Sequence, residues 1–128
     1  MPILNNIAEF TGRFFLSAIF LLSGFGKIGQ YAGTQAYMAA AGVPGQLLPL
    51  VIALELGGAA AVIIGWRTRL TALLLAGFSL LAAGLFHANL QDQMTMIMFW
   101  KNIAIAGGFL LLFAHGAGPW SLDARRTA

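Results

Sequence analysis

Four stretches of the chain are long and apolar enough to cross a lipid bilayer, and this feature limits the fold more than any other. They cover about residues 7–26, 47–65, 70–90 and 94–115. A membrane-spanning helix needs ~20 mostly apolar residues, because the hydrocarbon core of a bilayer is ~30 Å thick. The sequence therefore predicts an all-α integral membrane four-helix bundle, formed by residues 1–128 as a single transmembrane domain.

The composition supports lipid as the solvent and excludes several classes of function. Hydrophobic residues make up 59% of the chain and charged residues 9%, whereas a soluble domain carries about 25% charged residues. The formal net charge of +3 comes from Lys and Arg residues that are spread along the chain, so they do not form the basic stripe that binds nucleic acid. The absence of Cys excludes disulfides, iron–sulfur ligation and thiol redox relays.

The links between the apolar stretches predict the topology. Residues 66–69 and 91–93 are so short that the helices they join must be antiparallel neighbours. With four spans, both termini and the 66–69 link lie on one side, and that side carries Arg67, Arg69, Arg125 and Arg126. The opposite side has Lys27 as its one clear loop cation. Because Lys and Arg are enriched in cytoplasmic loops, we expect both termini to be cytoplasmic.

The longest connection, residues 27–46, contains a short helix that we expect to lie along the membrane surface between the first two spans. Thr34 is its expected N-cap, and Gly42 with Pro44 would end it. Its larger side chains would face the interface: Tyr31, Tyr37 and Met38.

One carboxylate, Glu55, lies in the middle of the second apolar stretch, eight residues past Leu47. That separation is about 12 Å at 1.5 Å per residue, which places Glu55 near the bilayer midplane. A charge at this depth costs about 2.5–3.5 kcal/mol on insertion scales, so a partner is required. Lys101 has a similar depth in the fourth stretch, and small residues on both helical faces direct the two charges into protein. We therefore predict a buried Glu55–Lys101 ion pair.

Five polar residues belong to the outer half of the predicted bundle: Lys27, Glu55, His87, Lys101 and Asn102. Together they could line a pocket that opens outward with a net positive lining, which suits a quinone head group or a small anion. His87 could exchange protons near neutral pH. Two structural alternatives stay open. The buried charges could only fix helix register, or Lys101 could extend to the interface and leave Glu55 protonated, because burial disfavours the charged form.

A second polar group is expected on the inner side. Glu9 precedes Arg13 by four residues, a favourable spacing for a helical ion pair. Asp123 follows the last span and could meet Arg13, Arg67 or Arg69. We interpret Glu9, Arg13, Arg69 and Asp123 as structural polar residues.

Small residues repeat every four positions along the second stretch, at Ala53, Gly57, Ala61 and Gly65. Such a pattern lets helix backbones approach closely in membranes. Its face is nearly opposite Glu55, so this helix belongs in the middle of the bundle or at an oligomer interface. A homo-oligomer is therefore one expected assembly within the bilayer.

The arrangement of potential ligands excludes several cofactors. His87 and His115 are predicted near opposite faces of the membrane, which excludes a haem held by both. The sequence has no metal-binding cluster of His, Cys and Asp, no Ser–His–acid set and no nucleotide-binding fingerprint. We expect no covalently bound cofactor. Redox chemistry would need a diffusible carrier such as quinone, or the cofactor of a soluble or membrane redox partner.

Several motifs resemble the DoxX family of small bacterial inner-membrane proteins over almost the whole chain. The first span, "RFFLSAIFLLSGFGKI", is similar to that of the family. The later motifs are Ala41–Pro44, Leu54-Glu55, Gly65, Thr68-Arg69, Phe86-His87, Lys101-Asn102 and "GAGPWSLD" at 116–123. The loop "YAGTQAYMAAAGVPG" is most similar to the YqjF-like branch of the family.

The resemblance implies a four-helix protein of the bacterial inner membrane. The family's name comes from a subunit of a quinone-linked sulfur oxidation enzyme, and other members are associated with oxidative and thiol stress. Lys27, Glu55, His87 and Lys101 match positions typical of the family. The leading hypothesis is a redox- or stress-associated subunit that binds quinone or a similar small molecule. The alternatives are a non-enzymatic scaffold or assembly protein and a small oligomeric transporter, and no catalytic residue is assigned.

Overall fold

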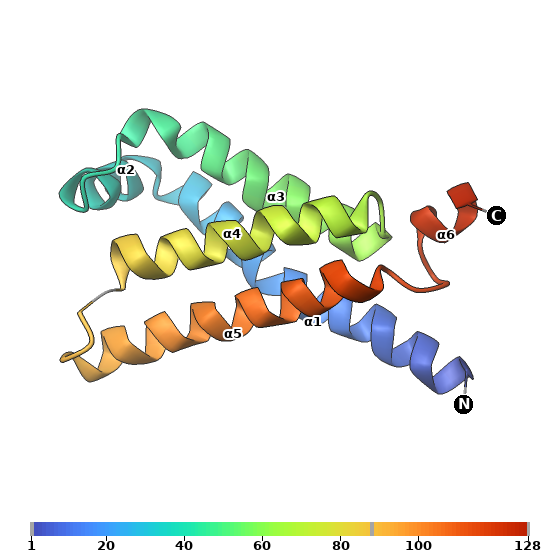
Figure 1. The fold of residues 1–128 in the computed structure, drawn as a ribbon. Coiled ribbons are helices and arrows are strands. Elements are labelled where there is room, and N and C mark those ends of the chain that lie inside the picture. Colours follow the sequence, from blue (N-terminus) through green and yellow to red (C-terminus); the bar gives the residue numbers. More distant parts are fainter. Residues whose placement is uncertain (1, 88, 128) are drawn as a thin grey trace.

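The computed structural model describes residues 2–87 and 89–127. In chain order its elements are α1 (Pro2–Gly29), α2 (Tyr31–Ala40), the 3₁₀ helix η1 (Gly45–Leu47), α3 (Leu48–Ile64), α4 (Thr68–Phe86), α5 (Gln93–His115) and α6 (Leu122–Thr127) (Figure 1). Within these described residues, four helices are long and apolar enough to span a membrane: α1, α3 with η1, α4 and α5. The predicted all-α membrane bundle is confirmed, together with the short helix between the first two spans.

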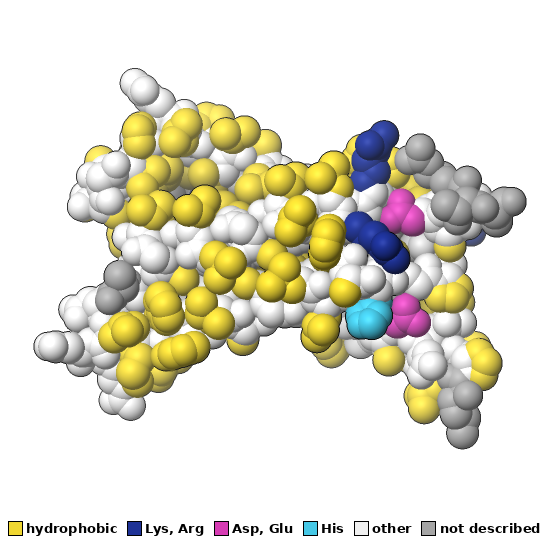
Figure 2. Space-filling model, in the orientation of Figure 1, with side chains coloured by type: hydrophobic (Ala, Val, Ile, Leu, Met, Phe, Trp, Pro, Cys, Tyr) yellow, Lys and Arg dark blue, Asp and Glu magenta, His cyan; other side chains and the backbone are white. Residues whose placement is uncertain are grey.

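The four long helices alternate in direction, so the two chain termini lie at the same end of the molecule (Figure 1). We call this end, which also holds the α3–α4 turn, the terminal end. The opposite end holds α2 and the α4–α5 link, and we call it the α2 end. On the face shown in Figure 2, charged side chains gather at the terminal end and apolar side chains cover much of the remainder. Large exposed side chains such as Phe15 and Leu22 are expected where the solvent is lipid.

The helix α4 occupies a different range from the predicted 70–90, and its start has a non-local cause. It begins at Thr68, where the backbone N–H groups of Arg67 and Thr68 donate to the Asp123 carboxylate at 2.7 and 2.8 Å. The first N–H groups of a helix have no partner within the helix, and a negative charge there also interacts favourably with the helix dipole. Asp123 therefore caps α4 from a distant part of the chain.

The helix α2 begins earlier than the Thr34 cap predicts. It starts at Tyr31, directly after Gln30 at the end of α1. Thr34 lies inside the helix, and its hydroxyl donates to the Gln30 carbonyl at 2.8 Å. The predicted N-cap role of Thr34 was wrong, because the chain turns at Gln30 and immediately resumes helical structure. The predicted end is confirmed, since α2 ends at Ala40 and Gly42 follows in the left-handed region at φ +83°.

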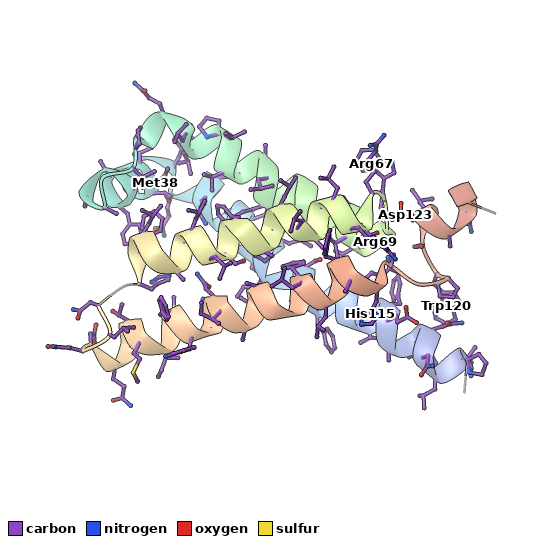
Figure 3. The ribbon with its side chains drawn as sticks, in the orientation of Figure 1. Met38, Arg67, Arg69, His115, Trp120 and Asp123 are labelled. Carbon is purple, nitrogen blue, oxygen red and sulfur yellow. The ribbon has the colours of Figure 1, made fainter. Side chains whose placement is uncertain are left out.

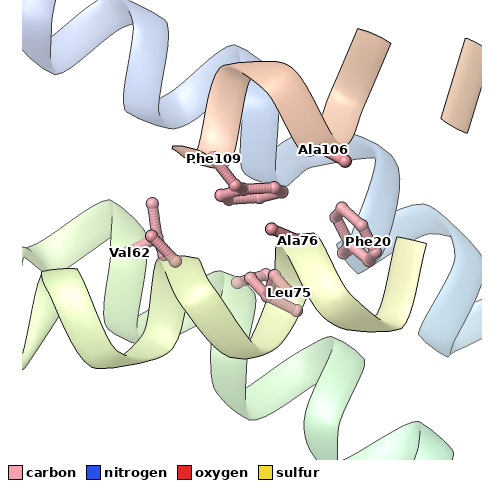
Figure 4. Close-up of a cluster of buried hydrophobic side chains, with 8 residues drawn as sticks. Phe20, Val62, Leu75, Ala76, Ala106 and Phe109 are labelled. Carbon is pink, nitrogen blue, oxygen red and sulfur yellow. The ribbon is translucent and has the colours of Figure 1, made fainter. Parts of the chain in front are cut away.

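Packing divides the bundle into neighbouring pairs. The most extensive contacts join α4 to α5 and α1 to α3, and α3 also packs on α4. At their meeting point is an apolar cluster that includes Phe20, Val62, Leu75, Ala76, Ala106 and Phe109 (Figure 4). The Phe20 and Phe109 rings lie 5.6 Å apart. This cluster separates a cavity at the α2 end from the polar groups at the terminal end.

The small-residue repeat on α3 has two different environments. Ala61 and Gly65 are buried within the chain, whereas Ala53 and Gly57 are exposed. A Cβ atom added at Gly57 would meet no atom within 4 Å. The half of the repeat near the terminal end thus packs inside the bundle, and the half near the α2 end faces outward.

Candidate ligand-binding cavity

A cavity of about 400 Å³ opens at the α2 end of the bundle. Its walls come from α1, α3, α4 and α5, and residues of α2 cover part of it. All five residues predicted to form an outer pocket line it: Lys27, Glu55, His87, Lys101 and Asn102. Most of the remaining lining is apolar and includes Phe20, which also belongs to the central apolar cluster.

The buried carboxylate of Glu55 is paired with Lys27. Lys27 Nζ lies 2.8 Å from Glu55 Oε1, and the two side chains are 26% and 3% exposed. The approach is not aligned as a hydrogen bond, so Oε1 keeps an unfilled acceptor position. The prediction of a Glu55–Lys101 ion pair was therefore wrong in its partner, although both residues line the same cavity.

Glu55 pairs with Lys27 because α1 packs closely on α3. A Cβ atom at Gly24 would lie 2.6 Å from Leu56 Cδ2 and 3.6 Å from Glu55 Cβ, so glycine lets the α1 backbone approach α3 at the level of Glu55. Long side chains on a helix point toward its N-terminus, and Lys27 accordingly reaches back along α1. Its Nζ also donates to Ser23 Oγ at 2.5 Å.

Lys101 lies on the opposite wall of the cavity. The helix that carries it, α5, packs mainly on α4, so no close contact brings Lys101 to α3. Its Nζ contacts Met98 Sδ at 3.7 Å, and no carboxylate within the described ranges 2–87 and 89–127 forms an ion pair with it. A thioether sulfur is a weak acceptor. The ammonium is therefore available to a hydrogen-bond acceptor inside the cavity.

Asn102 adds a second available polar group on the same wall. The residue is 9% exposed and lines the cavity, yet its amide has no hydrogen-bond partner in the described part of the chain. The amide can donate and accept, so it would gain from a ligand that presents a carbonyl or hydroxyl group.

His87 lies just beyond the C-terminal end of α4, at the edge of the same cavity. Burial lowers the pKa of His87 below its ordinary value, the nearby Lys101 charge lowers it further, and the Phe86 backbone opposes both. The imidazole is therefore neutral at neutral pH, when one ring nitrogen donates and the other accepts. The cavity wall thus combines one charged donor with two neutral groups.

Comparison with known proteins assigns the chain to a family. The DoxX family matches residues 8–88, which include every cavity residue of α1, α2, α3 and α4. The chain belongs to the DoxX family. Among its curated relatives, the Escherichia coli K12 inner membrane protein YqjF is 50% identical over 123 residues, which cover 96% of this chain and 95% of YqjF. The E. coli K12 inner membrane protein YphA is 38% identical over 132 residues, covering 97% and 91%. No solved structure matches the chain.

The protein should lose stability in detergent as the pH falls below about 6.5, the usual pKa of an unfolded His. Because the folded-state pKa of His87 is lower, the unfolded state binds the proton first, and stability falls between the unfolded and the folded pKa. Thermal unfolding from about pH 7.5 to 5.5 checks this. His87→Gln should reduce the fall, and the control His115→Gln should not. If the stability of wild type and of His87→Gln falls equally with pH, the lowered pKa of His87 is contradicted.

The structure adds cavity residues that the sequence interpretation placed elsewhere. Tyr37 and Met38, predicted to face the membrane surface, line the cavity. The Tyr37 ring stacks on Phe86 with centroids 5.1 Å apart, and Met38 is buried. Ser79 also lines the cavity, and its hydroxyl donates to the Leu75 carbonyl at 2.9 Å. The available signal for Ser79 was that it is a lone hydroxyl within an apolar run.

At the terminal end, Arg13 joins three segments of the chain. The side chain is 2% exposed. Its Nη1 donates to the Val62 carbonyl at 3.1 Å, and its Nη2 donates to the Trp120 carbonyl. The guanidinium lies over the Phe10 ring, 5.3 Å from its centroid, and no ion pair with Glu9 forms. The predicted i,i+4 ion pair was wrong, because the carbonyls of α3 and the C-terminal segment take the guanidinium donors.

The other predicted residues of this end have separate surroundings. Asp123 binds backbone N–H groups at the start of α4, as described above, and does not form an ion pair with Arg13. Arg69 lies against Gly116, where an added Cβ atom would be 3.2 Å from Arg69 Nε. Figure 3 shows Arg69, His115, Trp120 and Asp123 together at the terminal end, with Met38 at the other end.

The two histidines lie at opposite ends of the bundle, as predicted. His87 follows α4 at the α2 end, and His115 is the last residue of α5. No group of three or more His, Cys, Asp or Glu residues that could hold a metal ion occurs among residues 2–87 and 89–127.

Proposed function

We propose that this DoxX-family inner membrane protein is a redox- or stress-associated subunit that binds quinone or a similar small amphiphile in its cavity. The single observation that supports this most is the chemistry of the α5 wall. There, Lys101 donates only to the weak acceptor Met98 Sδ, and the Asn102 amide has no hydrogen-bond partner in the described part of the chain, inside a mostly apolar cavity. Small-molecule sites commonly combine apolar walls with a few such polar groups.

A quinone head group fits this lining in size and in hydrogen bonding. A cavity of about 400 Å³ lies within the ~300–1,000 Å³ typical of small-molecule sites. A carbonyl oxygen of the ring would accept from the Lys101 ammonium, and such charge-assisted hydrogen bonds are stronger than neutral ones. Asn102 would bind a second polar atom, while Phe20 and Phe78, whose rings lie 6.3 Å apart, provide apolar contact.

The chain's own contribution is binding and proton exchange. His87 at the cavity edge can take up and release a proton, because imidazole exchanges protons nearer to neutral pH than other side chains do. The electrons would come from a soluble or membrane redox partner, because the chain has no Cys and we assign no catalytic residue to it.

Protein purified in mild detergent should retain quinone, and Lys101→Met should lower the retained amount roughly tenfold, the effect of losing one charge-assisted hydrogen bond. Liquid chromatography with mass spectrometry of organic extracts measures the ratio of quinone to protein. The double variant with Lys101→Met and Asn102→Leu should retain less quinone than Lys101→Met alone.

Arg67→Met is the matched control, since it removes one cation from the terminal end and leaves the cavity intact. Wild-type protein without quinone, or equal retention by Lys101→Met and Arg67→Met, would overturn the proposal. A protein partner retained equally by all variants would instead favour a membrane scaffold or assembly protein. Solute flux in liposomes, lost in the cavity variants, would favour a small oligomeric transporter, for which exposed Ala53 and Gly57 offer a contact surface.

We further propose that both termini are cytoplasmic, which places the cavity in the outer half of the membrane. The terminal end carries Arg67, Arg69 and Arg125, whereas Lys27 and Lys101 at the α2 end are both directed to the cavity. The excess of exposed cations at the terminal end follows the positive-inside rule.

A further inference from the structure

A second hollow lies between α1 and α5 at the terminal end, on the far side of the apolar cluster from the cavity. Its volume is about 940 Å³. The two helices approach closely where Leu16 packs on Gly108, since a Cβ atom there would be 3.1 Å from Leu16 Cδ1. Toward the terminal end they diverge (Figure 1), and exposed Phe15 and Leu111 line the resulting groove. This groove between α1 and α5 faces the lipid.

Polar groups of both signs lie at the end of this groove. Glu9 and His115 line it directly, and an acidic side chain lies beside the His on the face shown in Figure 2. The Glu9 carboxylate lies against the backbone of Gly118, close enough that an added Cβ atom would overlap it. Arg69 packs over Gly116, which also lines the groove. The carboxylate and the guanidinium are thus placed at the same membrane interface.

Neither Glu9 nor Arg69 forms an ion pair in the described part of the chain. The charge of Glu9 acts on the nearby Arg13, but the Arg13 guanidinium donates to the backbone carbonyls of Val62 and Trp120. The other acidic residue of the terminal end, Asp123, accepts from the backbone at the start of α4. An apolar groove therefore ends at one available carboxylate, one available guanidinium and one imidazole.

We propose that the groove between α1 and α5 binds one phospholipid with a zwitterionic primary-amine head group. An acyl chain would lie against Phe15 and Leu111, replacing the helix contact that the divergence removes. Arg69 would bind the phosphate, for which the guanidinium geometry is well suited, and His115 would donate to it. Glu9 would accept from the ammonium group of the lipid. An anionic phospholipid would satisfy Arg69 but leave Glu9 facing a head group without a cation.

The test is competitive lipid retention by purified protein, read by native mass spectrometry. Protein in mild detergent is incubated with equal amounts of dioleoyl phosphatidylethanolamine and dioleoyl phosphatidylglycerol. Wild type should retain one molecule of the ethanolamine lipid in preference. Glu9→Gln should lower the ratio of ethanolamine to glycerol lipid roughly threefold, as for loss of one solvent-accessible ion pair. Arg69→Met should lower the retention of both lipids alike, because each carries a phosphate.

Asp92→Asn is the matched control, because it makes the same charge change as Glu9→Gln at the opposite end, where Asp92 is exposed. It should leave the lipid ratio unchanged. Equal retention of both lipids by wild type, or equal ratios for Glu9→Gln and Asp92→Asn, would overturn the proposal. A change from dimer to monomer in Glu9→Gln would also overturn it, by assigning the groove to a second copy of the chain.

Discussion

Replacing Lys27 with Met should destabilise the protein more than any other removal of a single charge. The substitution leaves the Glu55 carboxylate, 3% exposed, without a cation in the apolar interior. Breaking a buried pair by removing one partner costs about 3–5 kcal/mol, and the 26% exposure of Lys27 places our expectation near ~3 kcal/mol after allowance for screening. Unfolding by sodium dodecyl sulfate from mild detergent measures the loss.

Glu55→Gln should cost less than Lys27→Met, because the Lys27 ammonium that remains can extend toward the interface. The double variant should recover part of the sum, with a coupling free energy of about 0.5–3 kcal/mol. The control cycle combines Glu55→Gln with Lys101→Met, and those effects should add. Coupling of Glu55 to Lys101 without coupling to Lys27 would show that the carboxylate has the other partner.

The helices and the depth of their polar residues could be predicted because both depend on local sequence. Hydrophobic length sets each span, and the rise per residue sets the depth of Glu55. Small residues predicted that Glu55 faces protein, and Glu55 is buried on α3 together with Gly58 and Val62. For the same reason the five residues predicted to converge on one half of the bundle do line one cavity.

The partner of Glu55 could not be predicted in the same way. Periodicity shows which face of a helix is buried, but not which neighbouring helix that face meets. Predicted depth favoured Lys101, because Lys27 was expected at the outer end of the first span. The observed partner instead depends on Gly24, which lets α1 pack closely on α3. Once α3 is packed between α1 and α4, Lys101 on α5 is left across the cavity. The order of the helices therefore explains why Lys101 has no carboxylate partner and can donate to a ligand.

Local sequence patterns could not predict the contacts of the C-terminal segment, which contains Trp120 and Asp123. Asp123 and Thr68 are far apart in the chain, and no spacing rule connects a capping residue to a helix that begins 55 residues earlier. Arg13 shows the same limit: its spacing from Glu9 predicts a helical pair, yet its donors go to the carbonyls of Val62 and Trp120. The folded chain brings these backbone carbonyls to Arg13, where they replace the Glu9 carboxylate that the spacing predicts.

The second large loss of stability is expected at Gly65, on which Ser121 of the C-terminal segment packs. Gly65 ends α3 in the left-handed region with φ +77°, which costs a residue with a Cβ atom about 1–2 kcal/mol. An added Cβ would also overlap Ser121 Cβ and lie 2.5 Å from Arg13 Nη1, and overpacking of this kind adds about 1–3 kcal/mol. Gly65→Ala should therefore destabilise the protein by about 2–5 kcal/mol in total.

Gly57→Ala is the matched control on the same helix, because nothing lies within 4 Å of its added Cβ atom and Ala favours a helix interior by up to ~1 kcal/mol over Gly. The same detergent unfolding assay compares the two variants. The Asp123 N–H donates to the Gly65 carbonyl at 2.8 Å, so displacing this turn also moves the residue that caps α4. Gly65→Ala should accordingly increase protease cleavage after Arg125 in the folded protein, whereas Gly57→Ala should not. Equal stability of the two alanine variants would show that the C-terminal segment does not pack on the α3–α4 turn.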